Sequence, residues 1–419
     1  MRRSVAMAGC GAALLVTLAA CGGGSSDSSG SESASSSPSM PTSSSAGPEP
    51  SGEPLKIGLI NQENETIAFP EGSAAAKAVI AYLNAEQGGI DGRPAELVLC
   101  TTGDSAESAV ACANQFANDP SVPLVIVNTY NSAAVNKILV GKKALFTFNN
   151  DIPDMTTPDL YTLDPGILVP ASVSAQILAD QGVKTASIMY TDDPTVTAAI
   201  VPLVDAALTA AGIEVKQQVP VKSGGDYSAA VAAADPTGVD GVMMLLVDNS
   251  QCGPVGEALT DFGSTAKIVS ADVCSAPTTV ETGAVDGWRF PVTNTGSIDP
   301  AQPGPGTEEL RRILTTYSEG EPNFATLAGF TAAHVMAAVD LYTQVGADNV
   351  TTESLNELLA AGWQAQPLSY APVSCPGQDP FIGACATSQF VAEAVDGKLI
   401  LVSETPITVD LAPYAELLG

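Results

Sequence analysis

Short apolar runs alternate with longer amphipathic segments from Leu55 onward, and this alternation constrains the fold more than any other feature of the chain. Residues 55–60 have the length and composition of a strand, and residues 72–86 carry apolar side chains on one helical face before Gly88-Gly89. Further strands are expected at residues 97–100, 124–127 and 145–148, and helices at residues 105–116 and 132–139. Strands that alternate with helices at this interval predict a parallel sheet covered on both faces.

The pattern restarts after residues 164–166, Asp-Pro-Gly, and predicts a second sheet of the same kind. Strands are expected there at residues 185–190, 214–220, 241–247, 267–270 and 287–292, and helices at residues 169–181, 196–211, 228–234 and 255–262. Further helices are expected at residues 307–317, 325–345 and 352–361, followed by a hairpin at residues 390–404. The sequence therefore predicts an α/β fold with two doubly wound parallel sheets.

The first 21 residues have the features of an export signal followed by a lipid-attachment site. Arg2 and Arg3 precede the apolar residues 12–18, a segment too short to span a bilayer. Leu-Ala-Ala-Cys at residues 18–21 resembles a bacterial lipobox, whose cysteine is lipidated and becomes the first residue of the mature protein. We predict a signal peptide over residues 1–20 and a lipid anchor at Cys21 on the extracytoplasmic face of the cell membrane. A secretory signal that happens to contain a cysteine is the alternative.

Residues 21–54 form a segment of a different character. After Cys21 they are almost entirely Ser, Gly, Pro, Ala and Glu, with Met40 as the one large apolar side chain. Such a segment buries too little apolar surface to offset the entropy of ordering. We predict a flexible tether with a root-mean-square span of roughly 30 Å. The remaining residues, 55–419, are long enough for two domains.

The charge of the chain excludes several classes of partner. Its net charge of −30 repels nucleic acid and anionic lipid head groups, so nucleic-acid binding is not expected. Neither a metal site nor a cofactor is expected, because there is no Cys-x-x-Cys spacing and His334 is the only histidine. His334 lies among small residues in a helical stretch, which indicates a packing or surface position. The mature chain contains no P-loop, dinucleotide glycine motif, Gly-x-Ser-x-Gly elbow or His-Glu-x-x-His motif.

Six cysteines beyond Cys21 fit an oxidising compartment, and they fall into three pairs that are close in sequence. Six cysteines allow fifteen pairings, and closeness in sequence favours one of them. Loops of this size would each contribute roughly 3 kcal/mol by restricting the unfolded chain. The expected disulfides are Cys100 with Cys112, Cys252 with Cys274, and Cys375 with Cys385.

Four stretches resemble the branched-chain amino acid type of bacterial solute-binding protein, the periplasmic binding protein type 1 family. They are residues 56–60 (Lys-Ile-Gly-Leu-Ile), 81–93 (Ala-Tyr-Leu-Asn-Ala-Glu-Gln-Gly-Gly-Ile-Asp-Gly-Arg), 225–228 (Gly-Asp-Tyr-Ser) and 396–398 (Asp-Gly-Lys). The second stretch is the most specific, and the likeness covers nearly the whole chain beyond the tether. The resemblance implies a monomer that delivers a small solute to ABC permease subunits in the membrane.

The resemblance also implies two lobes joined by three crossovers. One lobe would contain residues 55–165 and 292–368, and the other residues 166–291 and 369–419. We expect hinges at Pro165, near Phe290-Pro291 and near Pro367.

Ligands of open parallel sheets bind beyond the carboxyl ends of the strands, so we expect the binding residues immediately after the predicted strands. Polar residues gather there, although a solvated turn is also polar. Phe69, Tyr130 and Phe148 could supply an apolar wall, although each is also a common core residue. The candidate ligand-binding residues are Asn61, Phe69, Asn128, Thr129, Tyr130, Asn131, Ser132, Asn149, Asn150, Asp192, Asp248 and Asp272.

The stretch from Asn128 to Ser132 is the strongest candidate, because it directly precedes a predicted helix. Its backbone N–H groups and hydroxyls would converge at the positive end of that helix, where a carboxylate can be held. The periplasmic binding protein type 1 family, which the chain resembles, has a Gly-Pro-x-Ser-Ser-type loop at this place that binds the ligand carboxylate. This chain keeps the donors but adds the bulk of Tyr130, which argues against an ordinary amino acid.

A ligand ammonium would need an acidic partner. Asp272 lies about where the resembling family positions a carboxylate for the ligand amine, and Asp248 and Asp192 are the alternatives. A disulfide between Cys274 and Cys252 would hold the Asp272 and Asp248 loops in place.

These features predict a lipid-anchored ABC importer component that captures a small polar solute, such as a branched-chain or other amino acid, an amide or a urea-like compound. We expect binding without catalysis. The first alternative is a sensor of the same fold that reports to a membrane receptor. The second is a secreted hydrolase acting through paired carboxylates, for which nothing in the sequence singles out a pair.

Overall fold

The computed structural model describes residues 47–64, 68–148, 152–194, 196–324 and 326–418. The expected signal peptide, Cys21, most of the tether, Asn149 and Asn150 lie outside these residues. The described end of the predicted tether is bound to the folded body, because the Gly47 N–H donates to the Ala85 carbonyl (3.0 Å) and the Ser51 N–H to the Gly92 carbonyl (2.8 Å). Within the described ranges, no helix has the length and apolar character needed to cross a membrane.

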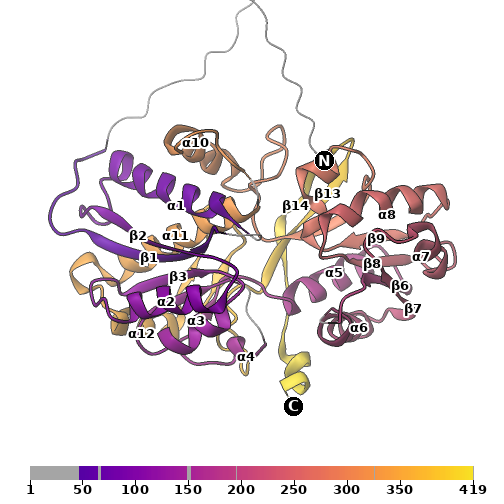
Figure 1. Ribbon diagram of the computed structural model, residues 1–419, viewed down its shortest axis with the longest axis horizontal. Coiled ribbons are helices and arrows are strands. Elements are labelled where there is room, and N and C mark those ends of the chain that lie inside the picture. Colours follow the sequence, from indigo (N-terminus) through magenta and orange to yellow (C-terminus); the bar gives the residue numbers. More distant parts are fainter. Residues whose placement is uncertain (1–46, 65–67, 149–151, 195, 325, 419) are drawn as a thin grey trace, which may run out of the picture. The chain divides into compact units, whose positions relative to one another are not determined.

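The first large sheet is parallel, with the strands in the order β2-β1-β3-β4-β5 (Figure 1). Its strands are β1 (Leu55–Gln62), β2 (Ala95–Thr102), β3 (Leu124–Asn128), β4 (Ala144–Thr147) and β5 (Tyr161–Thr162). The helices that belong to this part of the chain are α1 (Pro70–Tyr82), α2 (Ala106–Ala117), α3 (Ser132–Leu139), α4 (Ile152–Met155), α10 (Thr307–Tyr317), α11 (Thr326–Val345) and α12 (Thr352–Gly362). A π-helical turn, Leu83–Gln87, extends α1 to Gly88, which ends it with a φ of 72° as the Gly-Gly pair predicted.

Helices cover both faces of the first sheet, and β3 shows why its sequence is continuously apolar. Leu124 and Ile126 pack into the core formed with α1, α10, α11 and α12. Val125 and Val127 point to the opposite face and pack against α2 and α3. Successive strand residues alternate between faces, so a sheet covered on both sides needs apolar residues at every position. The predicted strand and helix pattern of this region is confirmed.

The second large sheet has the order β14-β13-β10-β9-β8-β6-β7. Its strands are β6 (Thr185–Thr191), β7 (Glu214–Val221), β8 (Gly241–Leu245), β9 (Lys267–Ser270), β10 (Arg289–Val292), β13 (Ser388–Val395) and β14 (Lys398–Thr408). The associated helices are α5 (Leu168–Asp180), α6 (Val201–Ala210), α7 (Tyr227–Ala233), α8 (Asn249–Asp261) and α9 (Pro277–Val280). The helices α5 and α6 pack on one face, and α7 and α8 on the other.

This second sheet is mixed rather than wholly parallel. The terminal hairpin of β13 and β14, yellow in Figure 1, pairs antiparallel with β10 and extends the parallel strands β6 to β10. The predicted helix at residues 255–262 starts earlier, at Asn249, and contains Pro254 in its interior. Proline usually lies at a helix start, which explains why the sequence placed the boundary too late.

The chain passes between the two sheets at three places, and the third lies later in the chain than the predicted hinge. The first passage follows β5 and contains Pro165. Phe290 and Pro291 lie inside β10, so the return passage comes after Val292. Residues after Pro367 remain with the first sheet, because the Thr162 N–H donates to the Gly383 carbonyl (2.7 Å) and the Cys385 N–H to the Thr162 carbonyl (3.1 Å). The last passage is therefore at Thr387, immediately before β13.

All three disulfides expected from the sequence are present. They join Cys100 to Cys112, Cys252 to Cys274, and Cys375 to Cys385. The third closes a loop that directly follows β12 (Val373–Ser374), which pairs with β11 (Gln364–Ala365) in a small sheet. There the Cys375 N–H donates to the Trp363 carbonyl (2.8 Å), which ties the loop to the end of α12.

Candidate functional site

A cavity of about 560 Å³ is lined by segments from both large sheets. Five of these segments begin where a strand ends: Tyr130 after β3, Phe148 after β4, Asp164 after β5, Leu246 and Val247 after β8, and residues 271–276 after β9. Carboxyl ends of parallel strands meet at one edge of a sheet, so loops distant in sequence converge there. The volume lies within the range of ~300–1,000 Å³ that is typical of small-molecule sites.

Aromatic side chains form the wall contributed by the first sheet. The rings of Tyr130 and Phe148 have centroids 6.0 Å apart in an edge-to-face arrangement, and Phe148 meets Phe330 of α11 at 5.2 Å. Phe69 supports Tyr130 from outside the cavity lining, with centroids 5.5 Å apart. Tyr130 remains 50% exposed although it belongs to this cluster, so its ring is available to a ligand.

Aliphatic side chains form most of the opposite wall. Leu246 and Val247 continue the apolar run of β8 beyond the strand, and Val247 is 55% exposed. Other aliphatic and thioether side chains that line the cavity on this side include Ile167, Ile200, Val204, Met243 and Leu245. A site for a small polar solute was expected, but this lining is mainly apolar. The lining is apolar because the last residues of strands, such as Leu245 of β8, are themselves apolar and face the cavity before the polar turn residues begin.

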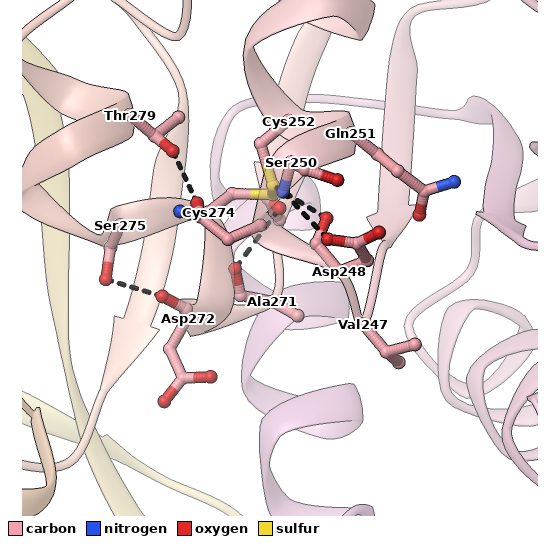
Figure 2. The surroundings of a disulfide bond; sticks show 12 residues. Val247, Asp248, Ser250, Gln251, Cys252, Ala271, Asp272, Cys274, Ser275 and Thr279 are labelled. Atoms are coloured by element: carbon pink, nitrogen blue, oxygen red, sulfur yellow. Dashed lines mark hydrogen bonds between the residues drawn. A yellow bond between two sulfur atoms is a disulfide. The ribbon is translucent and has the colours of Figure 1, made fainter. Parts of the chain in front are cut away.

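Asp272 is the most distinctive charged group of the cavity. It begins a short 3₁₀ turn after β9, and Cys274 in the same turn is bonded to Cys252 of α8. Figure 2 shows the Asp272 carboxylate directed away from this disulfide. Asp272 is exposed to the partly open cavity, and the cavity walls reduce the contact of its carboxylate with bulk water. The resulting loss of water raises the pKa of Asp272, although backbone hydrogen bonds from Val273 and its own N–H partly oppose this.

Two further carboxyl groups line the cavity, Asp164 and Glu71. Asp164 accepts a hydrogen bond from the Gly166 N–H (2.6 Å) in the passage between the sheets. Burial raises the pKa of Glu71, and the negative charge of Glu63 adds to this effect. Burial also raises the pKa of the Tyr130 phenol, and the charges of Asp272 and Asp164 raise it further. Asp272 and Asp164 therefore both act electrostatically on Tyr130 of the aromatic wall.

The loop from Asn128 to Ser132 does not form the open anion cradle that its sequence predicted. The Thr129 hydroxyl and the Tyr130 N–H both donate to the Gln62 side-chain oxygen, at 2.9 and 3.2 Å. The Asn131 N–H donates to the Thr129 hydroxyl (3.2 Å), and the Asn128 amide donates to Asn61. Asn128, Thr129 and Ser132 are buried, and within this loop only Tyr130 lines the cavity. The Gln62 side chain therefore accepts the hydrogen bonds that these donors would otherwise make to a ligand carboxylate.

The remaining predicted residues lie away from the cavity. Asn61 is buried and bonds to the Phe69 carbonyl (2.8 Å). Asp248 caps α8, and hydrogen bonds from the Ser250 hydroxyl and N–H lower its pKa. Asp192 is exposed and outside the lining. Of the ten candidate ligand residues within the described ranges, Tyr130 and Asp272 line the cavity.

Several residues that line the cavity were not predicted from the sequence. The start of α5, the segment 291–297 and Gln389 of β13 all reach the cavity, although the pattern treated them as connections or core. One signal was available, because the apolar run at residues 241–247 is longer than the strand it forms. Apolar residues beyond a strand end indicate a second surface that covers them.

Comparison with known proteins agrees with this architecture. A model of the periplasmic binding protein family matches residues 54–362. A leucine binding protein from Thermotoga maritima MSB8 is 18% identical, with a TM-score of 0.62 over 83% of this chain and 98% of that chain. A fatty acid ABC transporter substrate-binding protein from Thermomonospora curvata is 16% identical, with a TM-score of 0.64 over 88% and 95% of the two chains.

A solute binding protein from R. palustris in complex with benzoate is 16% identical, with a TM-score of 0.62 over 86% of this chain and 99% of that chain. At these identities the structural likenesses show the fold alone. No curated protein matches the sequence significantly. The family match spans most of the chain and includes three of the four stretches that carried the resemblance. The chain belongs to the periplasmic binding protein family.

Proposed function

We propose that this protein is the extracytoplasmic solute-binding component of an ABC importer. The observation that carries the proposal is the 560 Å³ cavity, whose walls come from the strand ends of both sheets. A ligand held there contacts both sheets at once, so it stabilises the arrangement in which they enclose it. Residues 163–167, the segment after Val292, and Thr387 are the proposed hinges, because they connect the sheets.

The proposed solute has an apolar body. The aromatic wall of Tyr130, Phe148 and Phe330 and the aliphatic wall around Leu246 and Val247 favour such a body over urea or a free amide. Proteins of this fold include ones described with leucine, benzoate and fatty acids, so the fold accommodates carbon-rich ligands.

A thermal-shift screen tests the proposed function. The soluble chain from Gly47 onward, screened against amines, amino acids, amides, alcohols and organic acids, should be stabilised by at least one class. At a ligand concentration of 100 Kd the expected gain in unfolding free energy is about 2.7 kcal/mol. Hits should be recovered unchanged by mass spectrometry. A screen without any stabilising compound, or one in which a hit is hydrolysed, contradicts the proposal.

We also propose that Cys21 carries the lipid anchor, as its lipobox-like surroundings predict. Replacing Cys21 with serine removes the thiol that accepts the lipid. The full-length variant should then move from the membrane fraction to the soluble fraction of the producing cells, whereas Cys10→Ser, in the signal region, should not change the distribution. Equal membrane association of the two variants would show that the anchor lies elsewhere.

A further inference from the structure

The cavity has a strong charge bias. Among its described lining residues the ionisable acids are Glu71, Asp164 and Asp272, and none of these residues is Lys, Arg or His. The internal residues outside the described ranges, 65–67, 149–151, 195 and 325, include no basic residue either. An anion in this cavity would meet three carboxyl groups and no opposite charge, which is unfavourable where water is restricted.

The negative charges converge from separate parts of the chain. Asp164 lies in the passage between the sheets, and Asp272 follows β9 of the second sheet. Both act on Tyr130 of the first sheet and on the buried Tyr370, raising the pKa of each phenol in addition to the larger effect of burial. The Asp272 carboxylate forms no ion pair with a basic side chain of the described chain. A ligand cation would supply the missing partner.

Gln389 provides an independent observation. Its side chain lines the cavity and is 3% exposed. The side-chain nitrogen donates to the Thr293 hydroxyl (3.0 Å), which leaves the oxygen Oε1 as a buried acceptor without a hydrogen-bond partner. Buried acceptors without a partner are rare and destabilising, so a ligand that donates a hydrogen bond to Gln389 Oε1 would be favoured. An ammonium group carries up to three N–H donors and no acceptor.

Several neutral donors near the cavity are engaged by the protein itself. The Asn249 amide donates to the Thr278 hydroxyl (3.2 Å), and the Ser275 hydroxyl donates to the Asp272 carbonyl (2.6 Å). The Thr129 hydroxyl and Tyr130 N–H are held by Gln62. A ligand carboxylate would compete with the protein for these donors, whereas a cation would face carboxylates and the ring faces of the aromatic wall.

We propose, building on the proposed binding function, that the cavity takes an organic cation: an amine with an apolar body and no carboxylate group. Asp272 pairs with the ammonium, Gln389 accepts a further N–H, and the aromatic and aliphatic walls enclose the carbon skeleton. The cavity thereby discriminates against zwitterionic amino acids and organic acids of the same skeleton.

Matched ligand sets test this charge preference by isothermal titration calorimetry at pH 7. One set is 2-phenylethylamine, phenylalanine, 3-phenylpropanoate and 2-phenylethanol, and the other is 3-methylbutylamine, leucine, 4-methylpentanoate and 3-methylbutanol. The amine of at least one set should bind roughly tenfold or more tightly than its three relatives, which corresponds to about 1.4 kcal/mol. An acid or amino acid that binds as tightly as its amine overturns the inference but leaves the proposed binding function intact. Failure of both amines to bind also overturns it.

The Asp272→Asn variant tests the assigned partner, and Asp261→Asn is its matched control. Asp261 is the exposed last residue of α8, so its replacement removes the same charge outside the cavity. Asp272→Asn should weaken amine binding roughly 30-fold or more, while Asp261→Asn should leave it unchanged. A melting temperature of the Asp272→Asn protein close to that of wild type at pH 7 would show that the variant is folded. Equal amine affinity in the two variants would show that Asp272 is not the partner.

Discussion

Replacing Trp363 with alanine should lower the free energy of unfolding by about 3–5 kcal/mol. Trp363 is 1% exposed and follows α12, where its ring stacks on Phe146 of β4 with centroids 5.8 Å apart. Its indole N–H donates to the Asp340 carboxylate at 2.9 Å. Alanine would leave a large void against the first sheet and remove that donor. Denaturant unfolding followed by circular dichroism measures the loss.

Trp363→Phe is the control for this prediction. It keeps an aromatic ring against Phe146 but removes the N–H, so it should lower the unfolding free energy by a smaller amount, about 1–2 kcal/mol. Trp363 does not line the cavity, so neither variant should change ligand affinity in the folded protein. A loss below about 1 kcal/mol for the alanine variant would show that Trp363 is not a major core contact.

Acidification from pH 6.5 to pH 4 should destabilise the protein by roughly 3 kcal/mol through His334 alone. His334 is 1% exposed, and burial lowers its pKa to about 4 despite the hydrogen bond between Nδ1 and the Phe330 carbonyl (2.7 Å). Phe330, Tyr370 and Phe146 surround the ring, and its Nε2 has no hydrogen-bond partner. Between these pH values the unfolded chain binds a proton that the folded protein does not. The neutral state of His334 therefore stabilises the folded protein fully above pH 6.5, and this stabilisation is lost as the pH falls to 4.

The His334→Gln variant isolates this effect, because His334 is the only histidine of the chain. Carboxyl groups titrate in both proteins and cancel in the comparison. The difference in unfolding free energy between wild type and variant should change by roughly 3 kcal/mol between pH 7 and pH 4, with a slope near 1.4 kcal/mol per pH unit. Parallel stability curves for the two proteins would contradict the buried, neutral state of His334.

Most elements of the fold could be predicted because their signals are local. The run at residues 124–127 is apolar throughout, as a strand covered on both faces requires, and it lies in β3. The helix ending at Gly88 was predicted from a residue type that tolerates a positive φ. The start of α8 was misplaced because Pro254 looks like a helix boundary in sequence, yet the helix continues through it.

The candidate site was predictable only in part. Strand ends were predicted as the region where ligands bind, and Tyr130 and Asp272, which follow β3 and β9, line the cavity. The Asn128 to Ser132 loop looked like an anion site because its donors are visible in the sequence. Gln62, which uses those donors, lies more than sixty residues earlier in the chain, and nothing local links the two segments.

The sequence by itself determined the α/β alternation, the parallel strands of both sheets and the three local cysteine pairs, because periodicity, turn residues and short loops act between neighbours in the chain. Tertiary structure alone decided the character of the cavity. Asp164, Asp272, Gln389 and the aromatic wall come from segments spread over some 260 residues, and they meet only because parallel strands end at a common edge. Which donors remain available to a ligand depends on contacts between those distant segments, which no local pattern encodes.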